Sequence, residues 1–221
     1  MLINVKKTKN IIFNFTDNFK FATRLNLKGE MVETIENTKL LGTIISNDLK
    51  WDLNTANIVK KANSRMELLR KVSSFGAPVQ DLITIYILFI RSLLEQSATV
   101  WHSSLSQENS NDLERVQKSA IKIILKDKYK GYKKSLAHLG LDNLNTRRKQ
   151  LCLDFAKKCE NHTKLTHMFP KNHKEHNMNT RFKEMYAVQH AKTSRLQKSP
   201  LIYMQKLLNE DTHKTFKDTH E

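Results

Sequence analysis

The sequence predicts a mainly helical protein in which a small N-terminal β-hairpin or β-sheet region precedes a helical bundle. Only 5 Gly and 3 Pro occur in 221 residues, and such a scarcity of turn residues favours helices over an all-β domain. A strand pattern in the first 50 residues gives way to a helical period after Asn54. We therefore expect strands over residues 1–50, helices over 51–165, and a basic, His-rich, partly disordered tail over 166–221.

Three segments of the first 50 residues are strand candidates. Ile11 to Phe15 is rich in β-branched and aromatic side chains, and Met31 to Ile35 alternates apolar and polar residues after a turn at Lys28-Gly29. Leu40 to Ile45 is a candidate for a buried strand, in which Gly42 marks a bulge or a close backbone approach.

The rest of the chain to about residue 165 has helical periodicity. Val59 to Val72 has apolar residues at three- and four-residue spacing, which predicts a helix that ends near Gly76. Val79 to Trp101 is apolar on nearly all sides and predicts a central buried helix. Three more helices are predicted: residues 110–126, a short helix through Leu136 and Leu139 stopped by Gly140, and one capped by Asn145 or Thr146 with Leu151, Phe155 and Cys159 inward.

The charge of the chain predicts a polyanionic partner. The sequence holds 38 Lys and Arg against 22 Asp and Glu, a formal net charge of +16. Half of this excess lies in residues 113–160, which hold 13 basic and 5 acidic side chains. Nucleic acid is the commonest polyanion that such a protein binds, and an anionic membrane comes next.

The cysteines and the apolar runs indicate an intracellular protein without a membrane partner. Cys152 and Cys159 would lie about 10 Å apart along one helix, which is too far for a disulfide. Two unpaired cysteines are typical of a protein in a reducing compartment such as the nucleus or the cytoplasm. The N-terminus is too basic for a signal peptide. The longest apolar run, Leu82 to Ile90, is too short to span a bilayer.

Short motifs follow one another in a recognisable order along residues 1–160. They are Asn4-Val5-Lys6-Lys7-Thr8-Lys9, Leu40-Leu41-Gly42-Thr43-Ile44-Ile45, Leu49-Lys50-Trp51, Leu68-Leu69-Arg70, Ile85-Tyr86, Ile90-Arg91-Ser92-Leu93-Leu94-Glu95, Val100-Trp101-His102 and Leu113-Glu114-Arg115-Val116-Gln117-Lys118. In this order and spacing they resemble the C-terminal part, palm end plus thumb, of jockey-like non-LTR retrotransposon reverse transcriptases.

The resemblance implies roles for three residues and for the helices. Lys7 matches the Lys of the palm's fourth motif, which lies on a strand near the leaving pyrophosphate, where its charge opposes the developing negative charge. Leu41 and Gly42 match the primer-grip hairpin. The helices from about residue 54 match the thumb, so a thumb-like bundle is expected.

The residues that would perform polymerisation are missing from the sequence. Two-metal catalysis needs carboxylates that hold two Mg²⁺ ions about 3.5–4 Å apart, and the family places them on a palm strand and in an aromatic-x-Asp-Asp turn. This sequence contains no Asp-Asp pair, and it begins where the catalytic palm would end. We expect a truncated or split copy that is no enzyme by itself and holds no cofactor, with the missing palm and fingers half as a candidate partner.

A stripe of cations is the candidate nucleic-acid site. Arg115, Lys118, Lys122 and Lys126 recur at spacings of three, four and four, which places them on one helix face that can follow a phosphate strand. A solvated helix face is an equally weighted interpretation. Further cations extend the predicted surface: Lys128, Lys130, Lys133, Lys134, Arg147, Arg148 and Lys149.

The remaining candidates have a structural interpretation that we favour. Lys7 lies in the run from Lys6 to Lys9, which is more typical of solvated lysines than of a functional site. The segment around Gly42 is more typical of a core strand than of a primer contact. Trp51, Trp101, Tyr129 and Tyr132 are expected to pack rather than to stack on bases. The spacing of Cys152, Cys159, His162 and His167 is no common zinc motif, so no metal is expected.

Two functional hypotheses follow. In the first, the chain is a catalytically incomplete fragment of an RNA-directed DNA polymerase that binds template–primer or duplex nucleic acid through backbone contacts. In the second, it is a helical protein-interaction module or a relic without a nucleic-acid role. Exposed apolar residues such as Phe13 and Phe15 would then contact a partner protein.

Overall fold

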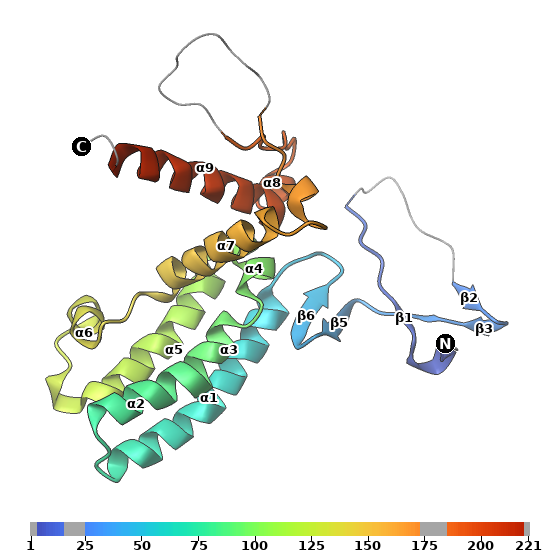
Figure 1. Ribbon diagram of the computed structural model, residues 1–221. Helices are drawn as coiled ribbons and strands as arrows, with labels where there is room; N and C mark the ends of the chain where they lie inside the picture. Colours follow the sequence, from blue (N-terminus) through green and yellow to red (C-terminus); the bar gives the residue numbers. More distant parts are fainter. Residues whose placement is uncertain (1–3, 16–24, 173–184, 219–221) are drawn as a thin grey trace.

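A computed structural model describes residues 4–15, 25–172 and 185–218 as a helical body that carries short strands at its N-terminal side (Figure 1). The expected fold class is confirmed: most described residues are helical, and each described sheet has two strands. Figure 1 shows the strands β1 to β4 extending away from the bundle, and the hairpin of β5 and β6 beside the first turn of α1.

The first strands are shorter than the sequence pattern predicts. β1 (Lys9–Asn10) pairs in parallel with β4 (Glu33–Thr34), and β2 (Asn26–Leu27) pairs antiparallel with β3 (Glu30–Met31) around the predicted turn at Lys28-Gly29. The strand predicted over Ile11 to Phe15 is wrong. Its β-branched and aromatic residues have no strand to pair with, because β4, the partner of β1, is only two residues long.

Leu40 to Ile45 forms a hairpin turn and not the single buried strand that the pattern predicts. β5 (Asn37–Leu40) and β6 (Thr43–Ser46) pair antiparallel, with Leu40 opposite Thr43. The two residues between them, Leu41 and Gly42, both have positive φ, at 48° and 91°, as a two-residue hairpin turn of type I′ requires. Leu41 is 90% exposed. The close approach expected at Gly42 is confirmed, because a Cβ there would meet the side-chain amide of Gln96.

The main core lies between the long helices α1 (Asp52–Ser74) and α5 (Gln107–Leu125) and the segment that joins them. The joining segment is α2 (Val79–Ile85), the π-helical turn η2 (Tyr86–Arg91), α3 (Ser92–Glu95), α4 (Ala98–Trp101) and η3 (His102–Ser104). The two long helices run in the same direction: Asn109 donates to Asp52 near their starts, and Ser73 donates to the Ile123 carbonyl near their ends. Both tryptophans are buried here, as expected: Trp51 and Trp101.

Val79 to Trp101 is an interrupted helix with one exposed side, contrary to the prediction of a single helix buried all round. The helix ends at Glu95, and Ser97 adopts a positive φ of 53° before α4 begins. Leu88 and Phe89 are exposed. In the described part of the chain, Val79–Ser104 is the one stretch whose length and composition would suit a membrane span, a test that core helices of soluble proteins also pass.

The last two predicted helices are present, but their details differ. α6 (Tyr132–Leu139) ends at Gly140, as predicted. α7 (Leu144–Glu160) is capped by Asn143, whose side chain accepts from the Thr146 amide at 2.8 Å, so the predicted cap at Asn145 or Thr146 is wrong. Its buried face consists of Leu144, Arg148, Cys152, Ala156 and Cys159, so the inward position predicted for Cys159 is confirmed, while Leu151 is half-buried and Phe155 is 44% exposed.

The C-terminal region packs against α7, and residues 185–218 contain helix within the tail that was expected to be partly disordered. It holds α8 (Ser194–Gln197) and α9 (Pro200–Asp218). Met204, Leu207 and Leu208 of α9 form a second core with the buried cysteines of α7. Lys149 and Lys157 of α7 pair with Glu210 and Asp211 of α9 at 2.8 and 2.6 Å. The tail residues 173–184 and 219–221 lie outside the described residues.

Candidate nucleic-acid interface

The geometry of α5 determines where its cations lie. Ser106 caps the helix by accepting from the Asn109 amide at 3.1 Å. The apolar residues that recur along the helix, Leu113, Val116, Ala120 and Ile124, are buried in the main core. The opposite face is therefore left for solvent.

Three of the four predicted cations, Arg115, Lys118 and Lys122, occupy that exposed face, and at 1.5 Å per residue they extend over about 10 Å. Lys126 is exposed too, but it follows the end of α5 with a positive φ of 47°, so the prediction that it continues the helical spacing is wrong. Lys128 and Lys130 are also exposed, and they lie in the turn η4 (Lys126–Lys128) and the segment after it, next along the chain from α5. We call these six residues the cation stripe: Arg115, Lys118, Lys122, Lys126, Lys128 and Lys130.

The members of the cation stripe differ in how firmly they are held. Arg115 pairs with Asp112 one turn earlier. Lys126 donates to the Ser73 carbonyl at 2.7 Å, which ties the end of α5 to the end of α1. The Lys122 ammonium lies 5.7 Å from the centre of the Tyr129 ring. Across the described residues, no ion pair with a carboxylate involves the five lysines of the stripe.

A polar network fixes α6 and the segment before it against α5. The Tyr132 hydroxyl donates to Glu114 and accepts from Gln117 at 2.8 Å, and Glu114 also accepts from the Leu144 amide at 3.1 Å. Burial and the Glu114 carboxylate raise the pKa of Tyr132 well above its ordinary value. Tyr129 and Tyr132 pack on Ile121, Leu125 and Leu136, so the expected packing role of both tyrosines is confirmed.

Arg147 and Arg148 do not extend the cation stripe, so this part of the prediction is wrong. Arg148 is on the buried face of α7 with 0% exposure, and its guanidinium lies 5.7 Å from the Trp101 ring. Its Nε donates to His102 Nδ1 at 3.4 Å, and its Nη2 donates to Ser110 at 3.3 Å. Arg147 is half-buried and pairs with Glu95 at 3.2 Å. A buried guanidinium cannot reach phosphate without unfolding its surroundings.

The neighbourhood of Arg148 also fixes the protonation of His102. Burial, with help from the charges of Arg148 and Lys149, lowers the pKa of His102 from 6.5 to about 4. The imidazole is therefore neutral at neutral pH, which leaves Nδ1 free to accept from Arg148. Burial lowers the pKa of Arg148 as well, yet an arginine side chain remains charged in proteins.

The residues matched to the palm and the primer grip lie outside the cation stripe. Lys7 is exposed in the 3-10 turn η1 (Val5–Lys7), and the strand that follows begins only at Lys9, so the expected strand position is wrong. Leu41 and Gly42 form the tip of the β5–β6 hairpin. The hairpin geometry that the primer-grip comparison implies is thus present, while the interpretation as a core strand is wrong for exposed Leu41.

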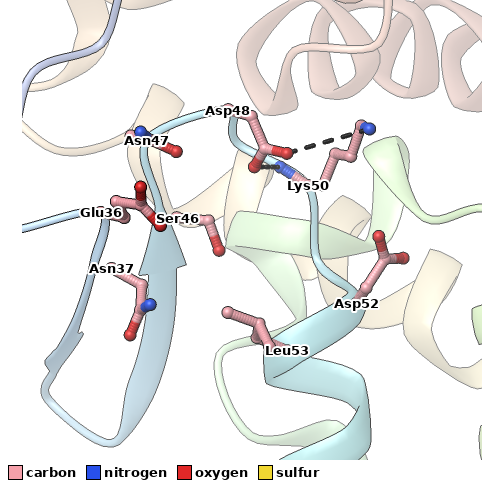
Figure 2. A pocket seen from close by; sticks show the side chains of 8 residues that line it. All are labelled: Glu36, Asn37, Ser46, Asn47, Asp48, Lys50, Asp52 and Leu53. Carbon is pink, nitrogen blue, oxygen red and sulfur yellow. Dashed lines mark hydrogen bonds and ion pairs between the residues drawn. The ribbon is translucent and has the colours of Figure 1, made fainter.

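An acidic pocket lies between the open end of this hairpin and the start of α1 (Figure 2). It has a volume of about 180 Å³, and its lining includes Glu36, Asp48 and Asp52 with Lys50. Asp48 accepts from the Lys50 amide at 2.9 Å, and its carboxylate lies 3.9 Å from the Lys50 ammonium. Three carboxylates against one lysine repel a polyanion, so this pocket does not extend the candidate interface.

No metal site accompanies these features in the described parts of the chain. Residues 4–15, 25–172 and 185–218 bring no three His, Cys, Asp or Glu side chains close enough to hold an ion. Cys152 and Cys159 are buried in the second core as free thiols, and burial raises the pKa of the Cys152 thiol to about 11. A thiol with a raised pKa is a poor metal ligand at neutral pH.

A larger cleft of about 900 Å³ brings together segments that no local pattern of the sequence connects. Residues 48–52, the start of α5 and residues 193–200 line it. Its cationic rim, Arg195 and Lys198, lies in the region expected to have little order. The only signal in the sequence was the basic character of that region.

Comparison of the chain with protein-family models, with curated proteins and with solved structures finds no match. The function proposed below therefore rests on the geometry and chemistry of the cation stripe, together with the motif order of the sequence.

Proposed function

We propose that the chain binds the phosphate backbone of duplex nucleic acid through the cation stripe. The observation that carries this proposal is the row of exposed lysines along α5 and η4, which have no carboxylate partners among the described residues. Lysine ammonium groups contact phosphates as point charges and do not distinguish base edges as a planar guanidinium does. We therefore expect binding that tolerates any base sequence.

The motif order extends this proposal to a biological context. The chain is proposed to be a catalytically incomplete fragment of a non-LTR retrotransposon reverse transcriptase, in which α1 to α6 act as the thumb against template–primer. The palm and fingers half is its proposed partner and would hold the Mg²⁺ ions. An intracellular location is part of the proposal, since both cysteines are free.

Binding should weaken steeply with salt, because each phosphate contact releases condensed counterions. With about five contacts, the affinity for a duplex is expected to fall on the order of several hundredfold between about 0.05 M and about 0.2 M monovalent salt. Fluorescence anisotropy of a labelled duplex across this range measures the slope. Equal affinity at both salt concentrations would rule out the cation stripe as the binding surface.

The purified chain is expected to incorporate no nucleotide on a primed template with Mg²⁺. The physical reason is that its sequence has no Asp-Asp pair to hold two metal ions at the primer end. A primer-extension gel, with an active reverse transcriptase as the positive control, checks this expectation. Extension that co-purifies with the chain and survives a change of purification tag would contradict it.

A protein-interaction module is the second candidate, and exposed apolar residues favour it. Leu41 is 90% exposed, Phe75 is 88% exposed and Leu88 is 61% exposed. Side chains of this size on the surface often mark a protein contact. Size-exclusion chromatography of the pure chain distinguishes the candidates, since a monomer that elutes as a compact species and binds duplex supports the first.

A further inference from the structure

The cleft of about 900 Å³ lies between two regions that are distant in sequence. One wall is the loop from Asp48 to Asp52 with the start of α5, and the other is residues 193–200 around α8. Its volume falls in the range of roughly 300–1,000 Å³ that holds small-molecule ligands. None of the six residues of the cation stripe lines it.

An aromatic platform stands at the rim of the cleft. The Arg195 guanidinium lies 4.1 Å from the centre of the Phe15 ring, and both residues line the cleft. Phe15 is 50% exposed and Arg195 is exposed, so both side chains are accessible to a ligand. Paired arginine and aromatic planes are surfaces on which nucleobases stack.

Lys198 is a second cation that lines the cleft, and hydrogen bonds to its backbone carbonyl hold it in place. The hydroxyls of Ser103 and Ser104 both donate to the Lys198 carbonyl at 2.7 Å, which fixes Lys198 on the cleft wall. No described ion pair involves Lys198 or Arg195. The platform is thus flanked by positive charge suited to a phosphate.

The carboxylates of the cleft are largely engaged on the opposite wall. Asp48 lies against Lys50, and Asp52 accepts from Asn109 at 2.7 Å. Glu108 is in the first turn of α5, where the helix dipole favours a negative charge. With three acidic and three basic side chains in its lining, the cleft has no net charge, which suits a ligand that is mainly an aromatic ring with few phosphates.

We propose that this cleft binds one or two unpaired nucleotides, with a base stacked on Phe15 and Arg195 and a phosphate at Lys198. The inference extends the proposed function from duplex to single strand, but different residues carry it. Because the cleft is neutral overall, its binding should depend on salt less than that of the cation stripe. A free mononucleotide and the unpaired end of a strand share the required chemistry.

The test measures the affinity of the full chain for two fluorescent probes, a ten-residue oligouridylate and a blunt duplex. Uridine monophosphate is added as an unlabelled competitor. Phe15→Ala and Arg195→Gln should each weaken oligouridylate binding about tenfold, as expected for the loss of one base stack. Blunt-duplex affinity should stay within about twofold. Phe75→Ala and Arg70→Gln, which change an exposed aromatic and an exposed arginine outside the cleft, should leave oligouridylate binding as it is.

The outcomes separate this inference from the proposed function. If variants of the cation stripe keep duplex affinity while Phe15→Ala loses oligouridylate, the proposed function fails and the cleft stands. Competition by uridine monophosphate that depends on Phe15 assigns the cleft to free nucleotides, and its absence assigns the cleft to strand ends. Unchanged oligouridylate binding in the Phe15→Ala and Arg195→Gln variants overturns the inference. The inference is also overturned if the chain binds a mixed-charge synthetic peptide in a Phe15-dependent way but does not bind oligouridylate.

Discussion

Replacing Lys118, Lys122, Lys128 and Lys130 together by glutamine is expected to weaken duplex binding on the order of a hundredfold at about 0.05 M salt. These four lysines are exposed, have no ion pair among the described residues, and form most of the cation stripe. Lys126 is left in place, because its contact with the Ser73 carbonyl joins α5 to α1. The variant therefore removes charge while leaving the hydrogen bonds of the bundle intact.

The salt dependence of the same variant gives a sharper readout than its affinity alone. Each lost phosphate contact should lower the slope of log affinity against log salt by about 0.9, so four contacts should lower it by about 3.6. Anisotropy titrations at four or more salt concentrations measure both slopes. A variant with weaker binding but an unchanged slope would mean that the lysines act through the fold and not through phosphate.

A matched control separates the cation stripe from net charge. Replacing Lys39, Lys60, Lys158 and Lys164 by glutamine lowers the net charge by the same amount, but these exposed lysines are scattered over β5, α1, α7 and the segment after α7. Duplex affinity should fall much less than in the stripe variant. Equal losses in the two variants would show that long-range attraction to the whole basic chain, and not the stripe, holds the nucleic acid.

The part of the cation stripe that lies on α5, namely Arg115, Lys118 and Lys122, is predictable because the apolar period and the cations belong to the same helix. The apolar period of Leu113, Val116, Ala120 and Ile124 fixes which face is buried, and the cations then fall on the opposite face by geometry alone. The same argument predicts α1, whereas the end of α6 at Gly140 is predicted from the positive φ that glycine readily adopts after a helix. Where a local period decides, no tertiary contact is needed to place a side chain.

The burial of Arg148 differs from the predicted surface position, although the sequence contains a signal for burial. It lies four residues after Leu144 and four before Cys152, so it occupies the same face as the residues that are buried. The charge of Arg148 predicts a surface position, whereas its place in the period predicts burial, and burial is what the structure shows. An arginine in such a position is buried when aromatic and polar partners are supplied from elsewhere, here Trp101, His102 and Ser110.

The C-terminal region and the cleft could not be predicted, because their contacts join distant segments. α9 is held by the second core and by pairs between Lys149 and Glu210 and between Lys157 and Asp211, about 60 and 54 residues apart in the chain. The apolar periodicity of a single helix carries no information about which distant segment it contacts. The hairpin turn at Leu41-Gly42 is not predicted for a local reason: leucine rarely adopts positive φ, and an apolar run such as Leu40 to Ile45 is typical of a strand.

Glu95→Ala is expected to lower the free energy of unfolding by about 3 kcal/mol. The Glu95 carboxylate is 13% exposed and lies 3.6 Å from Arg91 and 3.2 Å from Arg147, so it joins the end of α3 to the start of α7. Its removal leaves the guanidinium groups of Arg91 and Arg147, whose side chains are 19% and 37% exposed, without their carboxylate. Urea denaturation followed by circular dichroism measures the loss.

Glu67→Ala is the matched control for this change, since Glu67 also pairs with an arginine in a helix. Its carboxylate lies 3.3 Å from Arg70, but the two side chains are 58% and 56% exposed, so the expected loss is below about 1 kcal/mol. Duplex affinity of folded Glu95→Ala should not fall, because neither Glu95 nor Arg147 belongs to the cation stripe. A Glu95→Ala protein as stable as Glu67→Ala would mean that solvent reaches Arg91 and Arg147 freely. In that case Arg147 would again be available to phosphate, and the interface would extend onto α7.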